Sequence, residues 1–304
     1  MLIYLHQTML DGKVVHALTG VKCSSQCDIC GANPNDMNSA RVKERPVKGE
    51  HFKFGLSPLH CWIRFMECCL HIAYRIPFAK WQAKGPELKA IVASRKKEIR
   101  RKTQERLGLI LEKVKQGAGT TNDGNSARKF FEESAITSSI TGFDKTLMDQ
   151  FHVILRVLNE TQQVIDTEVF GKLLNSTFEL FQTLYPWYKM PVTIHKVLIH
   201  GCDIVNYFLL PIGSLSEEAL EARHKQVRYN RLHHTRKCSR EACMTDLMNS
   251  LLLSSDPAIA IYRQATRCKK RRKISAILHK FRHNMFCSIY DIIFLKHGKS
   301  LTYI

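Results

Sequence analysis

The sequence feature that most constrains the fold is a pair of cysteines and a pair of histidines at opposite ends of a long stretch with helical character. Cys27 and Cys30 form a C-x-x-C motif in a polar loop, and His195 and His200 form an H-x4-H motif in an apolar segment. Zinc prefers four Cys and His ligands in a tetrahedron, and motifs with such spacings often supply them. If one ion binds all four residues, the fold must bring together positions separated by more than half of the chain.

Each motif alone has a simpler explanation. A C-x-x-C pair arises by chance in a chain with 11 cysteines, and a histidine in an apolar segment is usually a hydrogen-bonded core residue. The odd cysteine count and the lack of an export signal favour thiols and metal ligands over disulfides. Taken together, the motifs make a zinc staple that joins the two ends of the helical stretch a stronger candidate than either motif alone, while the simpler explanations stay open. Closing so long a loop can stabilise a fold considerably.

Apolar residues recur at every third or fourth position over much of the chain, which predicts a mainly helical fold. We expect helices over residues 57–77, 87–116, 143–159, 167–184, 214–234 and 240–253. Residues 136–141 are expected to form a polar break. Ser214 and Glu217 have the spacing of a capping box, which predicts that Ser214 begins the 214–234 helix. Leu2–Leu10 is a candidate strand.

The charge balance indicates a polyanionic partner. Lys and Arg total 46 against 27 Asp and Glu, a net charge of +19, and DNA or RNA is the leading candidate partner. Phosphate contacts are expected along 96–102 and 223–240, although a charge run on a helix is often only a solvated face. The basic heptamer 267–273 is typical of nuclear import or nucleic-acid binding. No stretch reaches the ~18 uninterrupted apolar residues of a membrane span.

Two carboxylates are candidates for divalent-metal chemistry. Asp11 follows the candidate strand, and Glu221 lies within a helix that is otherwise basic. A carboxylate on a DNA-facing helix can hold a metal ion for phosphoryl transfer. The residues alone favour the simpler interpretation, an ion pair between Glu221 and Lys225 four positions later.

The chain resembles the C-terminal half of Transib-family DNA transposases over roughly residues 8–257, and it is more distantly similar to the catalytic subunit of the V(D)J recombinase. The resemblance rests on motifs that occur in the same order. They are Asp11-Gly12-Lys13, Cys27-x-x-Cys30, Leu59-His60-Cys61, Gly124-Asn125-Ser126-Ala127-Arg128, His195-Lys196-Val197-Leu198-Ile199-His200, and the stretch from Leu215 to Lys225 that contains Glu221.

In that family, an RNase H-like sheet carries two catalytic Asp, and a helix that follows a long helical insertion carries a Glu. These carboxylates hold Mg²⁺ or Mn²⁺ for DNA strand nicking and transesterification. The resemblance implies that Glu221 corresponds to the catalytic Glu and Asp11 to the second Asp. It also implies that a structural Zn²⁺ binds the ligands Cys27, Cys30, His195 and His200.

The family's first catalytic Asp lies far upstream of its second, and no counterpart precedes Asp11 here. The expected fold is therefore mainly α, a zinc-stapled helical insertion of an RNase H-like DD(E) transposase fold with most of the β-sheet missing. The expected domains are a remnant of the RNase H-like core over 1–22, the insertion domain over 23–200, C-terminal helices with the catalytic Glu over 201–256, and a basic divergent tail over 257–304.

These features together predict a nuclear, truncated Transib-like remnant. It would bind zinc and duplex DNA, and it would not nick or transfer DNA strands on its own with Mg²⁺ or Mn²⁺. Two alternatives stay open: a domesticated protein-interaction or DNA-binding module, and an enzyme fragment completed by a partner chain. A homodimer also stays open, and no membrane partner is expected.

Overall fold

The residues described by the computed structural model are mainly helical, and no strand occurs among them. They are residues 12–21, 23–113, 121–216, 218–259 and 261. The prediction of a mainly α fold is confirmed, whereas the candidate strand Leu2–Leu10 lies outside the described residues. Contacts divide the chain into two units, of which the first ends at Ser216 in the described part and the second follows it.

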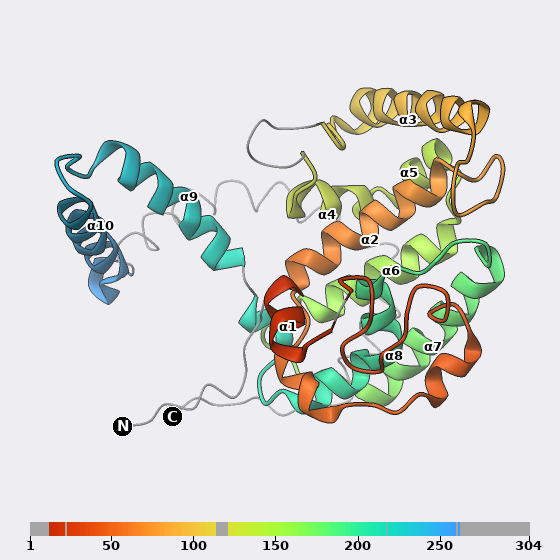
Figure 1. The fold of residues 1–304 in the computed structure, drawn as a ribbon, viewed down its shortest axis with the longest axis horizontal. Coiled ribbons are helices and arrows are strands. Elements are labelled where there is room, and N and C mark those ends of the chain that lie inside the picture. Colours follow the sequence, from red (N-terminus) through yellow and green to blue (C-terminus); the bar gives the residue numbers. More distant parts are fainter. Residues whose placement is uncertain (1–11, 22, 114–120, 217, 260, 262–304) are drawn as a thin grey trace, which may run out of the picture. The chain divides into compact units, whose positions relative to one another are not determined.

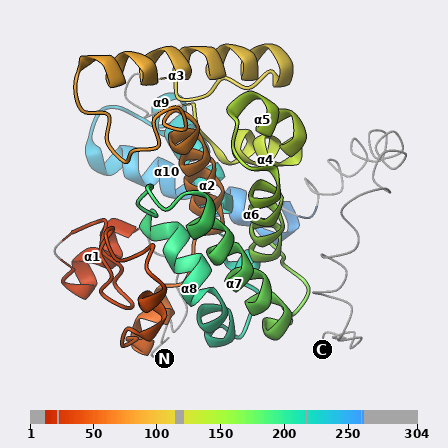
Figure 2. The same cartoon turned by 90° about the vertical axis from the view of Figure 1, so that its right-hand side faces the viewer.

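The first unit is a helical assembly with α2 at its centre. Helix α2 packs against α4, α6 and α8, while α7 packs against both α6 and α8 (Figure 1). The long helix α3 lies along one edge, against α5 (Figure 2). The elements are α1 (Gly12–Thr19), the 3-10 helices η1 (Ala40–Glu44) and η2 (Gly49–Phe54), α2 (Pro58–Ala73), α3 (Pro86–Leu107), α4 (Gly124–Glu132), α5 (Ser134–Thr141), α6 (Lys145–Leu158), α7 (Thr167–Leu184), α8 (Val192–Tyr207) and the 3-10 helix η3 (Ile212–Leu215).

Aromatic side chains fill the core of this unit. The rings of Phe65 on α2 and Phe151 on α6 meet edge to face, with centroids 4.8 Å apart. Burying one such side chain stabilises the fold by roughly 1.5–3 kcal/mol, so a set of them can hold the helices together without a metal. The fully buried phenylalanines are Phe65, Phe130, Phe131, Phe143, Phe151, Phe170, Phe178 and Phe181.

Short polar residues fix where several helices begin. Asp123 accepts a hydrogen bond from the first turn of α4, Asp144 does so for α6, and Asp166 does so for α7. These caps satisfy backbone N–H groups that have no partner within the helix. The predicted helix over 167–184 is confirmed to the residue, since α7 begins directly after its Asp166 cap.

Helix α3 ends earlier than predicted. The expected helix over 87–116 stops at Leu107, because Gly108 adopts a left-handed conformation with φ of 65°. Glycine has no Cβ and reaches this region without strain, which makes it a common helix terminator. The chain then returns along α3, where Arg100 Nε donates a hydrogen bond to Leu111 O at 2.8 Å.

The predicted polar break at 136–141 is wrong, because these residues belong to α5. Their hydroxyls find backbone acceptors: Thr137 Oγ1 donates to Phe130 O at 2.9 Å, and Thr141 Oγ1 donates to Thr137 O at 2.7 Å. Both threonines are therefore buried without an unsatisfied polar group. The predicted capping role of Ser214 is also wrong, since Ser214 lies within η3 and its hydroxyl donates to Pro211 O.

The second unit is a helical hairpin formed by α9 (Glu218–His233) and α10 (Arg240–Ser255). Polar contacts join the two helices. Arg223 donates to Ser254 Oγ at 2.7 Å, Asn230 donates to Ser250 Oγ at 2.7 Å, and Arg236 pairs with Asp246 at 2.9 Å. In neither unit does a described helix have the length and apolar character needed to cross a membrane.

The segment that follows α3 is anchored to α2 by a buried carboxylate. Glu112 has a left-handed backbone, with φ of 49°. Its side chain accepts a hydrogen bond from Tyr74 Oη at 3.0 Å and pairs with Lys96 Nζ at 2.7 Å. Burial alone would raise the pKa of Glu112, but hydrogen bonds from His71, Lys96 and Tyr74 outweigh it and lower the pKa to about 2.

Replacement of Glu112 by Gln should lower the free energy of unfolding at pH 7 by about 1–3 kcal/mol. The ordinary pKa of this carboxyl is 4.5, so its charged form stabilises the fold above that pH. This stabilisation is lost as the pH falls from 4.5 towards 2, and the difference between wild type and Glu112→Gln should shrink in that range. Urea denaturation followed by circular dichroism at several pH values measures it.

The matched control for this prediction is Glu105→Gln on α3. Glu105 pairs with Arg101 at the surface, where its side chain is 55% exposed. Exposed ion pairs contribute little, so this variant should change the stability by less than about 1 kcal/mol at any pH. A difference between wild type and Glu112→Gln that stays constant down to pH 3 would contradict the prediction.

Candidate metal centre

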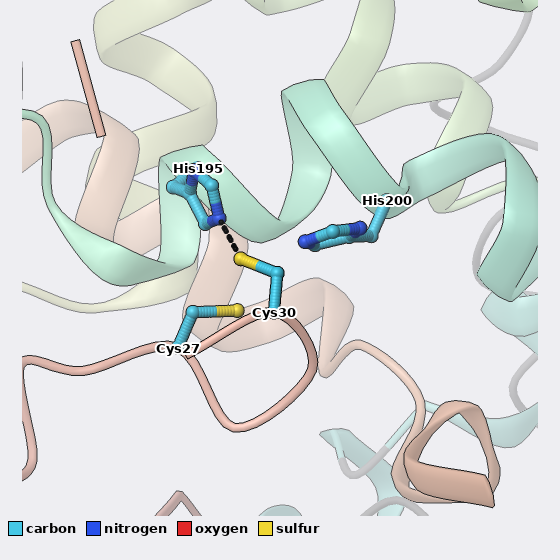
Figure 3. Close-up of side chains that lie close together, drawn as sticks. All are labelled: Cys27, Cys30, His195 and His200. Carbon is cyan, nitrogen blue, oxygen red and sulfur yellow. Dashed lines mark hydrogen bonds between the residues drawn. The ribbon is translucent and has the colours of Figure 1, made fainter. Parts of the chain in front are cut away.

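The two cysteines lie on a tight turn between α1 and α2. The backbone N–H of Gly31 donates to Cys27 O at 2.9 Å, and the N–H of Cys27 donates to Ala32 O at 2.8 Å. Gly31 has φ of 70°, a conformation that side chains other than glycine rarely adopt. These bonds close the chain on itself, and both thiols point from the turn towards α8 (Figure 3).

The two histidines lie on α8, which follows Pro191 and packs against α7 and α2. His195 is 0% exposed and His200 is 2% exposed, so both imidazoles are removed from water. Their ring centroids are 5.2 Å apart and the ring planes are nearly perpendicular, at 81°. Packing of α8 within the first unit thus holds both rings facing the cysteine turn.

Together the four side chains form one buried donor cluster (Figure 3). One ligand atom from each of Cys27, Cys30, His195 and His200 lies within 4.8 Å of all the others. Cys30 Sγ and His195 Nε2 are 3.2 Å apart. In a tetrahedral zinc site, bond lengths of about 2.0–2.3 Å place ligand atoms about 3.3–3.8 Å from each other, so a contraction of roughly 1.5 Å at most would complete the site.

Protonation of the cluster is compatible with metal binding. The hydrogen bond between the two cysteines raises the pKa of Cys27 and lowers that of Cys30 to about 7. Burial lowers the pKa of His195 and thereby favours its neutral form. Thiolate and neutral imidazole are the forms that bind metals. Near neutral pH the cluster therefore needs to lose few protons when it binds a cation.

Two ring nitrogens of the cluster, His195 Nδ1 and His200 Nε2, are buried without a hydrogen-bond partner among the described residues, and Nε2 of His200 is the one that faces the sulfur atoms (Figure 3). An unsatisfied buried polar atom costs free energy, and coordination of a cation would satisfy the lone pair of His200 Nε2. The residues present therefore fit a metal ion such as zinc.

Other buried cysteines do not belong to this cluster. Cys61, Cys68 and Cys69 lie on α2 and form part of the hydrophobic core. Burial raises the pKa of Cys68 and of Cys69, so both remain thiols and pack as small apolar groups. Cys27 and Cys30 thus differ from these core cysteines, because they lie on the turn that faces α8 and not on α2.

The structure brings together all four residues predicted as metal ligands. Of the two carboxylates predicted for catalysis, Asp11 lies outside the described residues. Glu221 lies on α9 in the second unit, and its side chain is outside the described part of the chain. The alternative ion pair between Glu221 and Lys225 therefore stays a prediction.

Sequence reasoning missed an ion pair beside the cluster. Asp28, between the two cysteines, pairs through Oδ1 with Lys196 Nζ, and Lys196 follows directly after His195. His51 Nδ1 donates to the backbone oxygen of Asp28 at 2.7 Å. The only signal in the sequence is that each charged residue neighbours a ligand, and this does not show that the two meet.

Comparison with known proteins adds no relative. No family model matches the chain, and no curated protein matches it. The metal centre is therefore defined by its donor atoms, their burial and their mutual distances.

We expect the purified protein to bind about one zinc ion per chain through this cluster. The double variant Cys27→Ser, His195→Ala removes one donor from each side and should lose the metal. Elemental analysis after dialysis against metal-free buffer measures the stoichiometry. Cys68→Ser serves as a control, because it changes a buried cysteine of the core and should retain the metal. A zinc content near zero in wild type, or one unchanged in the double variant, would refute the assignment.

Removal of the metal should loosen the segment between α1 and α2 far more than the aromatic core. That segment has only η1 and η2 as regular structure, whereas α6 is buried among phenylalanines. After treatment with a chelator, hydrogen exchange is expected to accelerate over residues 23–57 and to change little in α6. Equal acceleration in both regions would show that the metal holds the whole unit together.

Proposed function

We propose that this chain is a zinc-stabilised, helical DNA-binding protein of the Transib transposase type. The observation that carries the proposal is the meeting of Cys27, Cys30, His195 and His200 in one buried cluster. The resemblance assigns these four residues, and no others, as zinc ligands. Their convergence across more than half of the chain is a demanding geometric requirement, because each pair comes from a different segment.

Zinc in this cluster has a structural role in the proposal. Four protein ligands complete a tetrahedron and leave no position for a substrate. Two thiolates balance the charge of the ion, so a buried site becomes electrically neutral. The ion then fastens the cysteine turn to α8 and closes the stretch of helices α2–α7 between its two ends. In the family this stretch corresponds to the helical insertion of an RNase H-like domain.

The DNA-binding part of the proposal rests on the distribution of charge in α9 and in the turn to α10. No Asp or Glu occurs between Ala222 and Arg240. Lys225, Arg228 and Arg231 are exposed and recur at intervals of three residues, which places them along one side of the helix. Like charges at this spacing destabilise an isolated helix, and a polyanion bound along that side would offset the repulsion.

The other basic helix, α3, differs in this respect. Four of its eight cations are paired with acids. Arg101 pairs with Glu105 at 2.6 Å, and Lys102 pairs with Glu98 at 2.6 Å. Lys96 is engaged with Glu112. Of the two stretches expected to contact phosphate, the structure therefore favours 223–240 over 96–102.

A surface hollow adds to the case for the hairpin. Arg231, Lys237 and Arg240 contribute to an open hollow of about 670 Å³ where the turn enters α10, and the rest of its lining is Leu232, Ser239, Cys243 and Met244. Three cations around one hollow attract an anionic group such as a backbone phosphate. Duplex DNA is the polyanion that the resemblance implies, and a nuclear location follows from that partner.

Binding to duplex DNA should weaken steeply with added salt, since each phosphate contact releases a counterion. Replacing Arg228 and Arg231 by Gln should lower the affinity and reduce the slope of log K against log[salt] by about 2. Fluorescence anisotropy with a labelled duplex at several salt concentrations measures both quantities.

The matched control replaces Arg101 and Lys102 on α3 by Gln. It removes the same number of positive charges from a helix where they are paired with acids. We expect a slope close to that of wild type. An equal loss in both variants would mean that net charge, and not α9, determines binding. Lack of binding at low salt would refute the DNA-binding proposal itself.

A further inference from the structure

We infer that Asp28 and Lys196 act as a positioning pair for the metal centre, holding the cysteine turn against α8 in the geometry that the metal requires. The inference rests on the metal-binding part of the proposed function and extends it to residues that are not ligands. Asp28 lies between the ligands Cys27 and Cys30, and Lys196 is adjacent to the ligand His195. The ion pair therefore joins the same two segments that a metal ion would join.

This pair is more deeply buried than the other ion pairs given by the described residues. Asp28 is only 1% exposed, and the side chain of Lys196 is 16% exposed. By contrast, Lys172 and Glu168 on α7 are 74% and 79% exposed. Taking two charges out of water costs free energy that their attraction only partly restores. Stability alone is thus a weak reason for such a pair, and a defined geometry between two segments is a stronger one.

The remaining contacts of Asp28 leave Lys196 as its main source of compensation. Both carboxylate oxygens are buried and have no hydrogen-bond partner among the described residues, and the ion pair with Lys196 is formed by Oδ1. His51 contacts only the backbone oxygen of Asp28. Loss of the Lys196 charge would leave a buried carboxylate beside two metal-binding sulfurs. Hydration of that carboxylate requires the cysteine turn to move away from α8, which would separate the two cysteines from the two histidines.

The Asp28–Lys196 ion pair matters most in the metal-free protein. With no ion to hold the donors, the pair keeps the turn and the helix in register. Binding then requires little reorganisation, and the preorganised site has a higher affinity. Residues that orient metal ligands typically change metal affinity by about 10–100-fold when they are replaced.

The test uses Co²⁺ as the probe, because its visible spectrum reports tetrahedral coordination by sulfur and nitrogen. The metal-free full chain and its variants are titrated with Co²⁺ under reducing conditions. Lys196→Met should lower the affinity by about 10–100-fold. Lys196→Arg keeps the charge and should recover most of the loss. The double variant Asp28→Asn, Lys196→Met removes both charges and should bind more tightly than Lys196→Met alone, because no buried charge is left unpaired.

Two controls separate positioning from general stability. Lys172→Met removes a lysine from an exposed ion pair and should leave the Co²⁺ affinity unchanged. The helix content and the free energy of unfolding of each metal-free variant are measured in parallel. A Lys196→Met protein that is folded, or less stable, but binds Co²⁺ with wild-type affinity and spectrum would overturn the inference while leaving the metal site intact. If the wild-type protein itself binds no Co²⁺, the metal-binding proposal fails together with the inference.

Discussion

The contact between the Cys27–Ala32 turn and α8 is the interaction on which the segment before α2 depends. This segment contains only η1 and η2 as regular structure, so few backbone hydrogen bonds hold it in place. It reaches the helical core through residues that are distant in sequence. Besides the metal cluster and the Asp28–Lys196 pair, Asn38 donates to Tyr188 O and accepts from Gln182. These specific polar and ligand contacts add to apolar burial, because Ile29, Met37 and Val42 of this segment also belong to the hydrophobic core.

The helices from α2 to α8 are held together by a different kind of interaction. Their aromatic side chains are almost wholly buried, and hydrophobic burial is not directional. Such a core fixes which helices meet, but it does not aim individual donor atoms at a common point. The metal cluster uses this core as a scaffold, because α8 can present two histidines to the cysteine turn only when its other contacts keep it fixed. Apolar packing therefore fixes the position of α8, and a metal ion bound by the cluster would add a directional constraint to it.

Charge in this protein matters by its arrangement and not only by its total. Two basic regions contribute to the net charge of +19. In α3, Glu98 and Glu105 pair with neighbouring cations. From Ala222 in α9 to Arg240, no Asp or Glu occurs. In a helix such as α3, where acids lie near cations, charges of opposite sign pair at the helix surface. The stretch Ala222–Arg240 has only positive charges among its Lys, Arg, Asp and Glu residues, and such a stretch gains from an external partner of the opposite sign. This contrast is why the stretch 223–240, with seven Lys and Arg, leads to a different functional proposal from α3, with eight.

The sequence by itself determined the features that depend on neighbours within about four residues. It predicted a mainly helical chain, the extent of α7, and the two candidate ligand motifs, because helical periodicity and ligand spacing are local patterns. That the two motifs form one site was implied by the resemblance, and the structure brings them together. Only the tertiary structure decided that α5 is a helix, that Asp28 meets Lys196, and that Glu112 is held between α2 and α3. Each of these depends on which buried surfaces, acceptors and charges a distant segment brings into contact. Such pairings follow from the packing of whole helices, and they produce no periodic pattern in the sequence.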